Sequence, residues 1–224
     1  MALHGAGVTF VLDRAGITGD DGPSHNGMWD IALTGIVPTL MVAAPRDEPT
    51  LRELLRESVA ISDVPTLLRF PKGEIGKDIP AQSRVGDIDL IVKGNRNEIL
   101  VIGVGSFVSL ALEAAQLLEA EGIATSVVDP RWLKPISDDL VEIITLFETV
   151  IVLEDGITHA GFASSLSERM RAEDIDIPLL SLGIPLTFLQ HSKRKEVLGE
   201  LGLTPEVVAK SASEMHTRIR VRSF

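Results

Sequence analysis

Ionisable side chains that could bind an anion or move a proton are concentrated in one loop near the amino terminus. Arg14, Asp20, Asp21 and His25 lie close together there, among glycines, a proline and an asparagine. The loop follows an apolar run at 8–12, which predicts a strand buried on both faces. Open α/β sheets bind ligands in loops that follow their strands. The pattern therefore predicts a binding or catalytic site in this loop.

His25 and the pair Asp20-Asp21 each have two interpretations. His25 can be a turn residue that hydrogen-bonds within its own loop. It can also be an imidazole that titrates near neutral pH and exchanges protons with a bound intermediate. An Asp-Asp-Gly triplet is common in surface turns, so Asp20 and Asp21 can be either turn residues or functional carboxylates.

Cations follow two of the predicted strands. Arg14 comes after the first strand, and Arg69 and Lys72 lie at the end of another, predicted at 66–70. Parallel strands bring their carboxyl ends to one edge of a sheet, so Arg14 and Lys72 can meet there. A guanidinium and an ammonium together suit a phosphate group. The alternatives are an ion pair of Arg14 with a nearby carboxylate such as Asp13, and a structural role for Arg69.

Strand and helix patterns alternate along the rest of the chain. This alternation predicts an α/β fold of two three-layer units with mostly parallel sheets, the first of them incomplete. We expect a first unit at 1–76, a linker at 77–94 and a second unit at 95–224. The incomplete first sheet should leave an exposed strand edge, which favours association. The strands are expected at 8–12, 39–44, 66–70, 99–103, 124–128, 149–153 and 178–182, and the helices at 50–61, 107–121, 137–146, 161–172, 193–199 and 205–215.

Composition excludes several classes of function. The 224 residues include no cysteine, which excludes disulfides, a cysteine nucleophile and cysteine metal ligands. A net charge of −11 disfavours general nucleic-acid binding. The sequence has neither a signal-peptide pattern nor an apolar run that could span a bilayer, so we expect a soluble cytoplasmic protein with no membrane partner.

Three motifs in order resemble the 1-deoxy-D-xylulose-5-phosphate synthases, thiamine-diphosphate enzymes of the transketolase-like group. They are DRAGITGDDGPSHNGMWD at 13–30, VPTLMVAAPRD at 37–47 and LLRFPKG at 67–73. The resemblance extends over nearly the whole chain, but only to the carboxyl-terminal portion of such an enzyme. It implies part of a pyrimidine-binding domain, followed by a transketolase-like carboxyl-terminal domain.

The resemblance also implies roles for four residues. His25 would face the thiamine-bound intermediate, and Asp21 would line the substrate channel. Arg14 and Lys72 would hold the phosphate of glyceraldehyde 3-phosphate. The family often has arginine where this chain has Lys72, so the bidentate contact of a guanidinium is lost at that position.

Thiamine diphosphate and Mg²⁺ are the cofactors that the resemblance implies for the complete enzyme. The Gly-Asp-Gly metal motif and the glutamate that activates thiamine precede the matched portion in the family. We therefore expect part of a synthase that condenses pyruvate with D-glyceraldehyde 3-phosphate, releases CO₂, and supplies isoprenoid, thiamine and pyridoxal precursors. This part is expected to be inactive alone, and to act as a homodimer or with the missing amino-terminal portion.

Two alternatives remain at this stage. One is another transketolase-like protein, such as a β-type subunit of a 2-oxo-acid dehydrogenase. The other is a non-catalytic dimerisation or regulatory module. The turns at 103–106 and 154–162 are interpreted as structural or dimer-facing, His4, His191 and His216 as surface residues, and 217–224 as a frayed tail.

Overall fold

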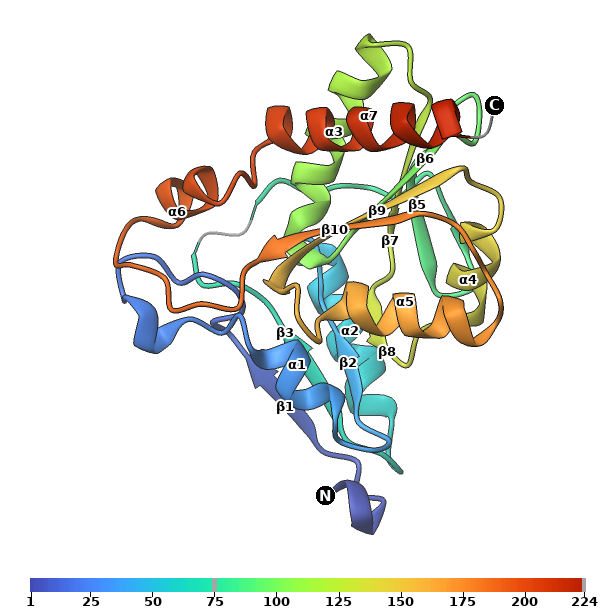
Figure 1. The fold of residues 1–224 in the computed structure, drawn as a ribbon. Helices are drawn as coiled ribbons and strands as arrows, with labels where there is room; N and C mark the ends of the chain where they lie inside the picture. The colour runs from blue at the N-terminus through green and yellow to red at the C-terminus, as the bar shows by residue number, and fades with distance from the viewer. Residues whose placement is uncertain (74–75, 223–224) are drawn as a thin grey trace.

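The structure, a computed structural model, describes residues 1–73 and 76–222, without the side chain of Arg222. It contains two β-sheets (Figure 1). In the first sheet the strand order is β1-β3-β2-β8, and β8 is antiparallel to β2 while the other pairs are parallel. Its strands are β1 (Thr9–Leu12), β2 (Met41–Ala43), β3 (Thr66–Arg69) and β8 (Trp132–Lys134).

The second sheet has six strands in the order β10-β9-β6-β7-β5-β4. The four strands from β10 to β7 are parallel, and β5 and β4 extend the sheet in antiparallel fashion. These strands are β4 (Ser83–Val85), β5 (Ile88–Val92), β6 (Ile99–Gly103), β7 (Thr125–Asp129), β9 (Thr149–Ile157) and β10 (Leu179–Ile184). The mostly parallel α/β architecture with two sheets confirms the expected fold class.

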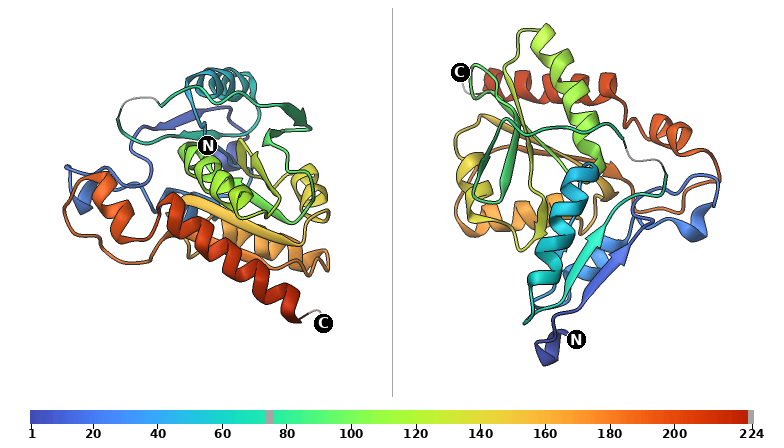
Figure 2. Two further views of the ribbon diagram at one scale, coloured as in Figure 1. Left: turned by 90° about the horizontal axis from the view of Figure 1, so that it is seen from above. Right: turned by 180° about the vertical axis from the view of Figure 1, so that it is seen from behind.

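Helices cover both faces of the second sheet (Figures 1 and 2). Side chains of α3 and α7 share one buried cluster with one face, and those of α4 and α5 share another with the opposite face. No helix in the described part of the chain is long and apolar enough to cross a membrane. The helices are α1 (Asp30–Gly35), α2 (Glu48–Ala60), α3 (Val108–Ala120), α4 (Asp138–Ile144), α5 (Phe162–Ala172), α6 (Arg194–Glu200) and α7 (Pro205–Arg222), with short 3₁₀ turns at η1 (Ala2–His4), η2 (Pro23–His25) and η3 (Gly105–Phe107).

Strand β1 differs from its prediction. It is an edge strand, and Phe10 and Val11 are 44 % and 50 % exposed. Neighbouring side chains of a strand point to opposite faces, so the expectation of a strand buried on both faces is wrong. Among the described residues, β3 is the only strand that pairs with β1. The exposed sheet edge expected beside this strand is present.

The range 77–94, expected to connect the two units, contains more structure than a linker. Strands β4 and β5 form a hairpin there, and β5 pairs with β7, so this range completes the second sheet. Strand β8 crosses in the other direction and pairs with β2 of the first sheet. The two sheets are therefore interleaved in sequence. Residues 74–75, near the end of the predicted first unit, and residues 223–224, in the predicted tail, lie outside the described part of the chain.

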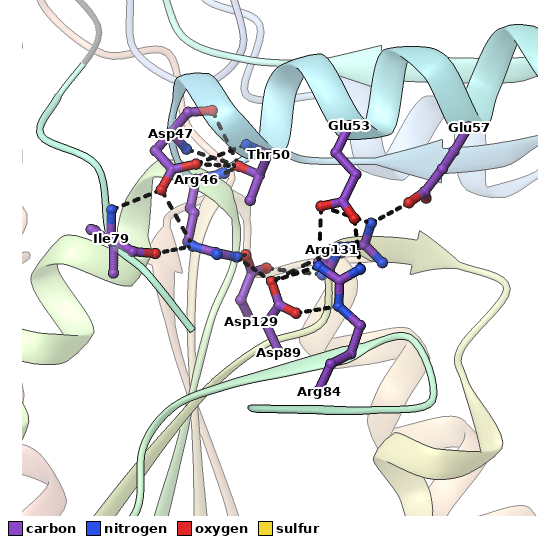
Figure 3. A network of polar contacts seen from close by, with 10 residues as sticks. All are labelled: Arg46, Asp47, Thr50, Glu53, Glu57, Ile79, Arg84, Asp89, Asp129 and Arg131. Atoms are coloured by element: carbon purple, nitrogen blue, oxygen red, sulfur yellow. Dashed lines mark hydrogen bonds and ion pairs between the residues drawn. The ribbon is translucent and has the colours of Figure 1, made fainter. Parts of the chain in front are cut away.

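A buried charge network joins the two sheets (Figure 3). Arg46, at the start of α2, donates to Asp89 of β5 at 2.6 Å and to Asp129 of β7 at 2.7 Å. Arg131 pairs with Glu57 of α2, and Arg84 bridges Asp89 and Glu53. Burial raises the pKa of Asp129 to about 6, even though the hydrogen bond from Arg46 opposes this shift. Helix α2 is thus tied to the second sheet by charged side chains.

Candidate active site

The candidate site is built on the loop that leaves the carboxyl end of β1 and leads into α1. The amide of Ala15 donates to the carbonyl of Phe70 at 3.0 Å, and the amide of Gly27 donates to the carbonyl of Gly16 at 2.9 Å. These bonds close the base of the loop against the end of β3. Residues 17–26 project from that edge and lie beside α6 in both views (Figures 1 and 2).

Arg14, Asp21 and Lys72 meet at this edge. Arg14 Nη1 lies 2.6 Å from Asp21 Oδ2, and Lys72 Nζ lies 2.8 and 2.7 Å from the two carboxylate oxygens of Asp21. The side chains of Arg14 and Lys72 are 48 % and 44 % exposed, against 24 % for Asp21. The two cations from separate strand ends therefore converge, and one carboxylate bridges them.

The electrostatics of the cluster favour an anion. The hydrogen bond from Lys72 is the main reason why the pKa of Asp21 lies below its usual value; the positive charges of Lys72, Arg14 and His25 lower it further. His25 ends the turn η2 on the same loop, is exposed, and has Nδ1 3.1 Å from Ser24 Oγ. Its ring is open to solvent, and its charge acts on Asp21 of the same loop.

The second unit holds the tip of this loop through two long-range hydrogen bonds. His191 Nε2 lies 2.7 Å from the carbonyl oxygen of Asp20, so this nitrogen has the proton. Arg194 Nη1 donates to the carbonyl oxygen of Ile17 at 2.7 Å. Both donors precede or begin α6, and both acceptors lie in the residues that lead to Asp21. The second unit therefore helps to position Asp21.

A buried ion cluster lies beneath the base of the loop. Arg69 is 1 % exposed, and its Nε donates to Asp30 Oδ2 at 2.7 Å. Its Nη1 lies 2.6 Å from Asp155 Oδ1, without the alignment of a hydrogen bond. Gly16 packs directly against Asp155, since a Cβ at that position would lie 2.9 Å from Oδ2. Arg69 thus connects β3, α1 and β9 and stays away from solvent, as expected for a structural residue.

Glu154 precedes this aspartate and is fully buried. Its carboxylate accepts the amides of Phe162 at 2.8 Å and Ala163 at 3.1 Å, at the start of α5. Burial raises its pKa to about 7, although these two amides act in the opposite direction. The protein's own carboxyl group therefore occupies the start of α5.

Comparisons with known proteins match this arrangement over nearly the full chain. Residues 89–208, more than half of the chain, match the transketolase C-terminal domain, and residues 1–77 match the transketolase pyrimidine-binding domain. The chain belongs to the transketolase family. The turn at 103–106 and the segment 154–162 lie within the matched C-terminal domain.

Among transketolase-family proteins, this chain is similar to enzymes named 1-deoxy-D-xylulose-5-phosphate synthase. The protein of Rhodococcus jostii is 50 % identical over 212 residues, which cover 94 % of this chain and 33 % of the relative. The protein of Saccharopolyspora erythraea is 48 % identical over 217 residues, which cover 96 % and 34 %. The chain thus spans about a third of the length of the curated relatives that it matches.

A solved structure described as a split gene transketolase, inactive beta4 tetramer, has the same fold. It superposes with a TM-score of 0.81 at 27 % identity, covering 94 % of this chain and 67 % of that one. The fold expected from sequence, two transketolase-like units with the first incomplete, agrees with this neighbour.

A divalent metal needs several oxygen or nitrogen ligands in one place. Across residues 1–73 and 76–222, no three His, Asp or Glu side chains gather in an arrangement that could hold a metal ion. The described residues therefore do not offer such a ligand set for the metal that positions thiamine diphosphate.

His191 and Arg194 are the site residues that sequence reasoning missed. His191 is exposed, as expected, but it also hydrogen-bonds to a loop 171 positions away, and no local pattern indicates such a contact. His216, expected on the surface, is 3 % exposed, and that interpretation is wrong. It lies within α7, where the ring nitrogen Nδ1 is 3.4 Å from Thr149 Oγ1.

Proposed function

We propose that this chain is the substrate-binding portion of a thiamine-diphosphate-dependent 1-deoxy-D-xylulose-5-phosphate synthase. Such an enzyme condenses pyruvate with D-glyceraldehyde 3-phosphate and releases CO₂. The observation that supports this most is the convergence of Arg14 and Lys72 from two strand ends on Asp21, which lies in the same loop as His25. Relatives of that name at 48–50 % identity support the same reaction.

In this proposal Arg14 and Lys72 hold the phosphate of the aldehyde substrate. Each charged hydrogen bond to phosphate contributes about 1.5–3 kcal/mol. His25 exchanges a proton with the bound intermediate, a step that typically accelerates a reaction by about 10²–10⁴-fold. Asp21 lines the path between the two, because it lies on the same loop and contacts both cations.

In this proposal, thiamine diphosphate and Mg²⁺ are bound by residues that lie outside this chain. A homodimer or the missing amino-terminal portion would complete the site, in the cytoplasm. The exposed edge of β1 is a surface on which such association is favourable, since its backbone groups are available for pairing.

A second candidate is a subunit that works with a separately encoded partner. The solved neighbour is described as a split gene transketolase in an inactive beta4 tetramer, and this chain covers two thirds of it. By that analogy the chain would assemble with itself when alone and become active only with its partner.

The test joins the chain to the amino-terminal two thirds of the Rhodococcus jostii relative. With thiamine diphosphate, Mg²⁺, pyruvate and glyceraldehyde 3-phosphate, the fusion should consume both substrates and release CO₂. In the fusion His25→Ala should lower kcat by about 10²–10⁴-fold. His4→Ala, a matched exposed histidine in η1, should leave kcat unchanged.

Equal rates for the His25→Ala and His4→Ala fusions would show that His25 has no role in the reaction. A fusion that folds and stays inactive would reject the synthase assignment. A calorimetric titration of the unfused chain with thiamine diphosphate and Mg²⁺ is the companion measurement. No heat is expected in that titration. Binding of one cofactor per chain would contradict the proposal that residues outside this chain bind thiamine diphosphate.

A further inference from the structure

The cations proposed to hold the substrate phosphate already have an anionic partner. Asp21 accepts from Arg14 at 2.6 Å and from Lys72 at 2.7 and 2.8 Å, so both carboxylate oxygens are engaged. Carboxylate and phosphate oxygens accept the same hydrogen bonds from guanidinium and ammonium groups at the same distances. A phosphate cannot take these positions while the Asp21 carboxylate remains in them.

The charges of the cluster point the same way. Two cations and one carboxylate leave a net charge of +1, whereas a phosphate monoester has a charge of about −1.5 to −2 at pH 7. A phosphate that replaced Asp21 would neutralise both cations. A phosphate that bound beside Asp21 would meet only one uncompensated positive charge, and the negative Asp21 carboxylate would repel it.

Asp21 lies in a tight turn, which the amide of Gly22 closes by donating to the carbonyl of Gly19 at 2.9 Å. Gly19 and Gly22 flank the Asp20-Asp21 pair at φ +75° and +79°, a region that glycine enters without steric cost. The carbonyl of Asp20 is held by His191 at 2.7 Å, which leaves a fixed point directly before Asp21. Because the backbone is held on both sides, rotation of the Asp21 side chain about its Cα–Cβ bond can carry the carboxylate away from the cations without moving the turn.

We propose that Asp21 is an internal substitute for the substrate phosphate. Its carboxylate occupies the Arg14–Lys72 site until a phosphorylated substrate displaces it. The proposal rests on the assignment of Arg14 and Lys72 as the phosphate site. Displacement makes entry selective, because a dianionic phosphate can replace the carboxylate whereas an unphosphorylated aldehyde cannot. The released carboxylate is then available to face the substrate beside His25.

The test measures binding of glycerol 3-phosphate, an unreactive triose phosphate, to this chain by titration calorimetry. Asp21→Asn should bind about three- to ten-fold more tightly than the parent chain, the size expected from losing one or two exposed ion pairs. Asp20→Asn is the matched control, since it removes the same charge from the adjacent exposed position, and its affinity should stay within about two-fold of the parent.

Two further variants separate the possible failures. Arg14→Gln combined with Asp21→Asn should abolish the gain, which shows that the added affinity is located at the cation pair. If Arg14→Gln weakens binding while Asp21→Asn binds like the parent, the phosphate site stands and the internal substitute is rejected. If no variant binds glycerol 3-phosphate at millimolar concentration, the phosphate site itself is rejected, and this inference with it. Circular dichroism of each variant verifies that it is folded.

Discussion

Glu154 is a single residue whose environment sets a measurable property of the protein. It is fully buried at the start of α5, and burial raises its pKa to about 7. In the unfolded chain the same carboxyl group titrates near its usual value of 4.5. Below pH 4.5 both states keep the proton. Between 4.5 and 7 the unfolded state releases it first, so unfolding becomes progressively easier as pH rises.

We predict that Glu154→Gln flattens this dependence. The contribution of Glu154 to the free energy of unfolding should fall by about 1.4 kcal/mol per pH unit in that interval, or about 3 kcal/mol in all, and stay constant above pH 7. Urea unfolding at several pH values between 4 and 8 measures it. The exposed Glu142→Gln should parallel the parent, and an equal slope in Glu154→Gln would show that Glu154 is ionised in the folded protein.

At the scale of elements, the segment that enters α6 determines how firmly the site loop is held. Arg194 and His191 contact the carbonyls of Ile17 and Asp20. The loop itself is short of apolar anchoring between 18 and 26, since the side chains there are mostly polar or glycine. Its order therefore depends on hydrogen bonds from the second unit more than on its own packing.

We predict that Arg194→Ala loosens the loop and leaves the sheets intact. A lost charged hydrogen bond, worth about 1.5–3 kcal/mol, should accelerate amide hydrogen exchange of residues 17–22 by about ten-fold or more. Amides of β6 and β9 should exchange as before. The control is Lys195→Ala, an exposed neighbour on the same helix. Equal exchange in both variants would mean that the loop is held by its base alone.

At the scale of the whole molecule, the network in Figure 3 joins α2 to the second sheet. Arg46 lies between two buried carboxylates, Asp89 and Asp129, which belong to neighbouring strands. Without a cation between them, two like charges would face each other in the interior. The network therefore makes the position of the first sheet depend on the second.

We predict that Arg46→Met destabilises the protein by about 3–5 kcal/mol, because removal of one partner leaves buried charge uncompensated. Urea unfolding at pH 7.5 measures the loss. Arg52→Met, within α2, removes an exposed pair with Glu48 and should cost about 0.5 kcal/mol or less. Similar losses in the two variants would show that the buried network adds no more than a surface ion pair.

Much of the fold can be predicted from the sequence. Apolar runs and helical periods are local, so strands such as β6 and helices such as α3 fall within a residue or two of their expected positions. The hairpin β4–β5 and strand β8 were missed, because strands of three to five residues have little periodicity of their own. The exposure of the two faces of β1 was also missed, since an apolar run does not indicate whether other elements cover the strand.

For the candidate site, the sequence by itself determined which residue types follow which strands. It thereby determined that Arg14 and Lys72 lie at one edge, since parallel strands share their direction. Only the tertiary structure decided that Asp21 bridges these cations and that His191 holds the loop from a distant segment. The physical reason is range: secondary structure follows from neighbours in the chain, whereas hydrogen bonds between remote side chains depend on how whole elements pack.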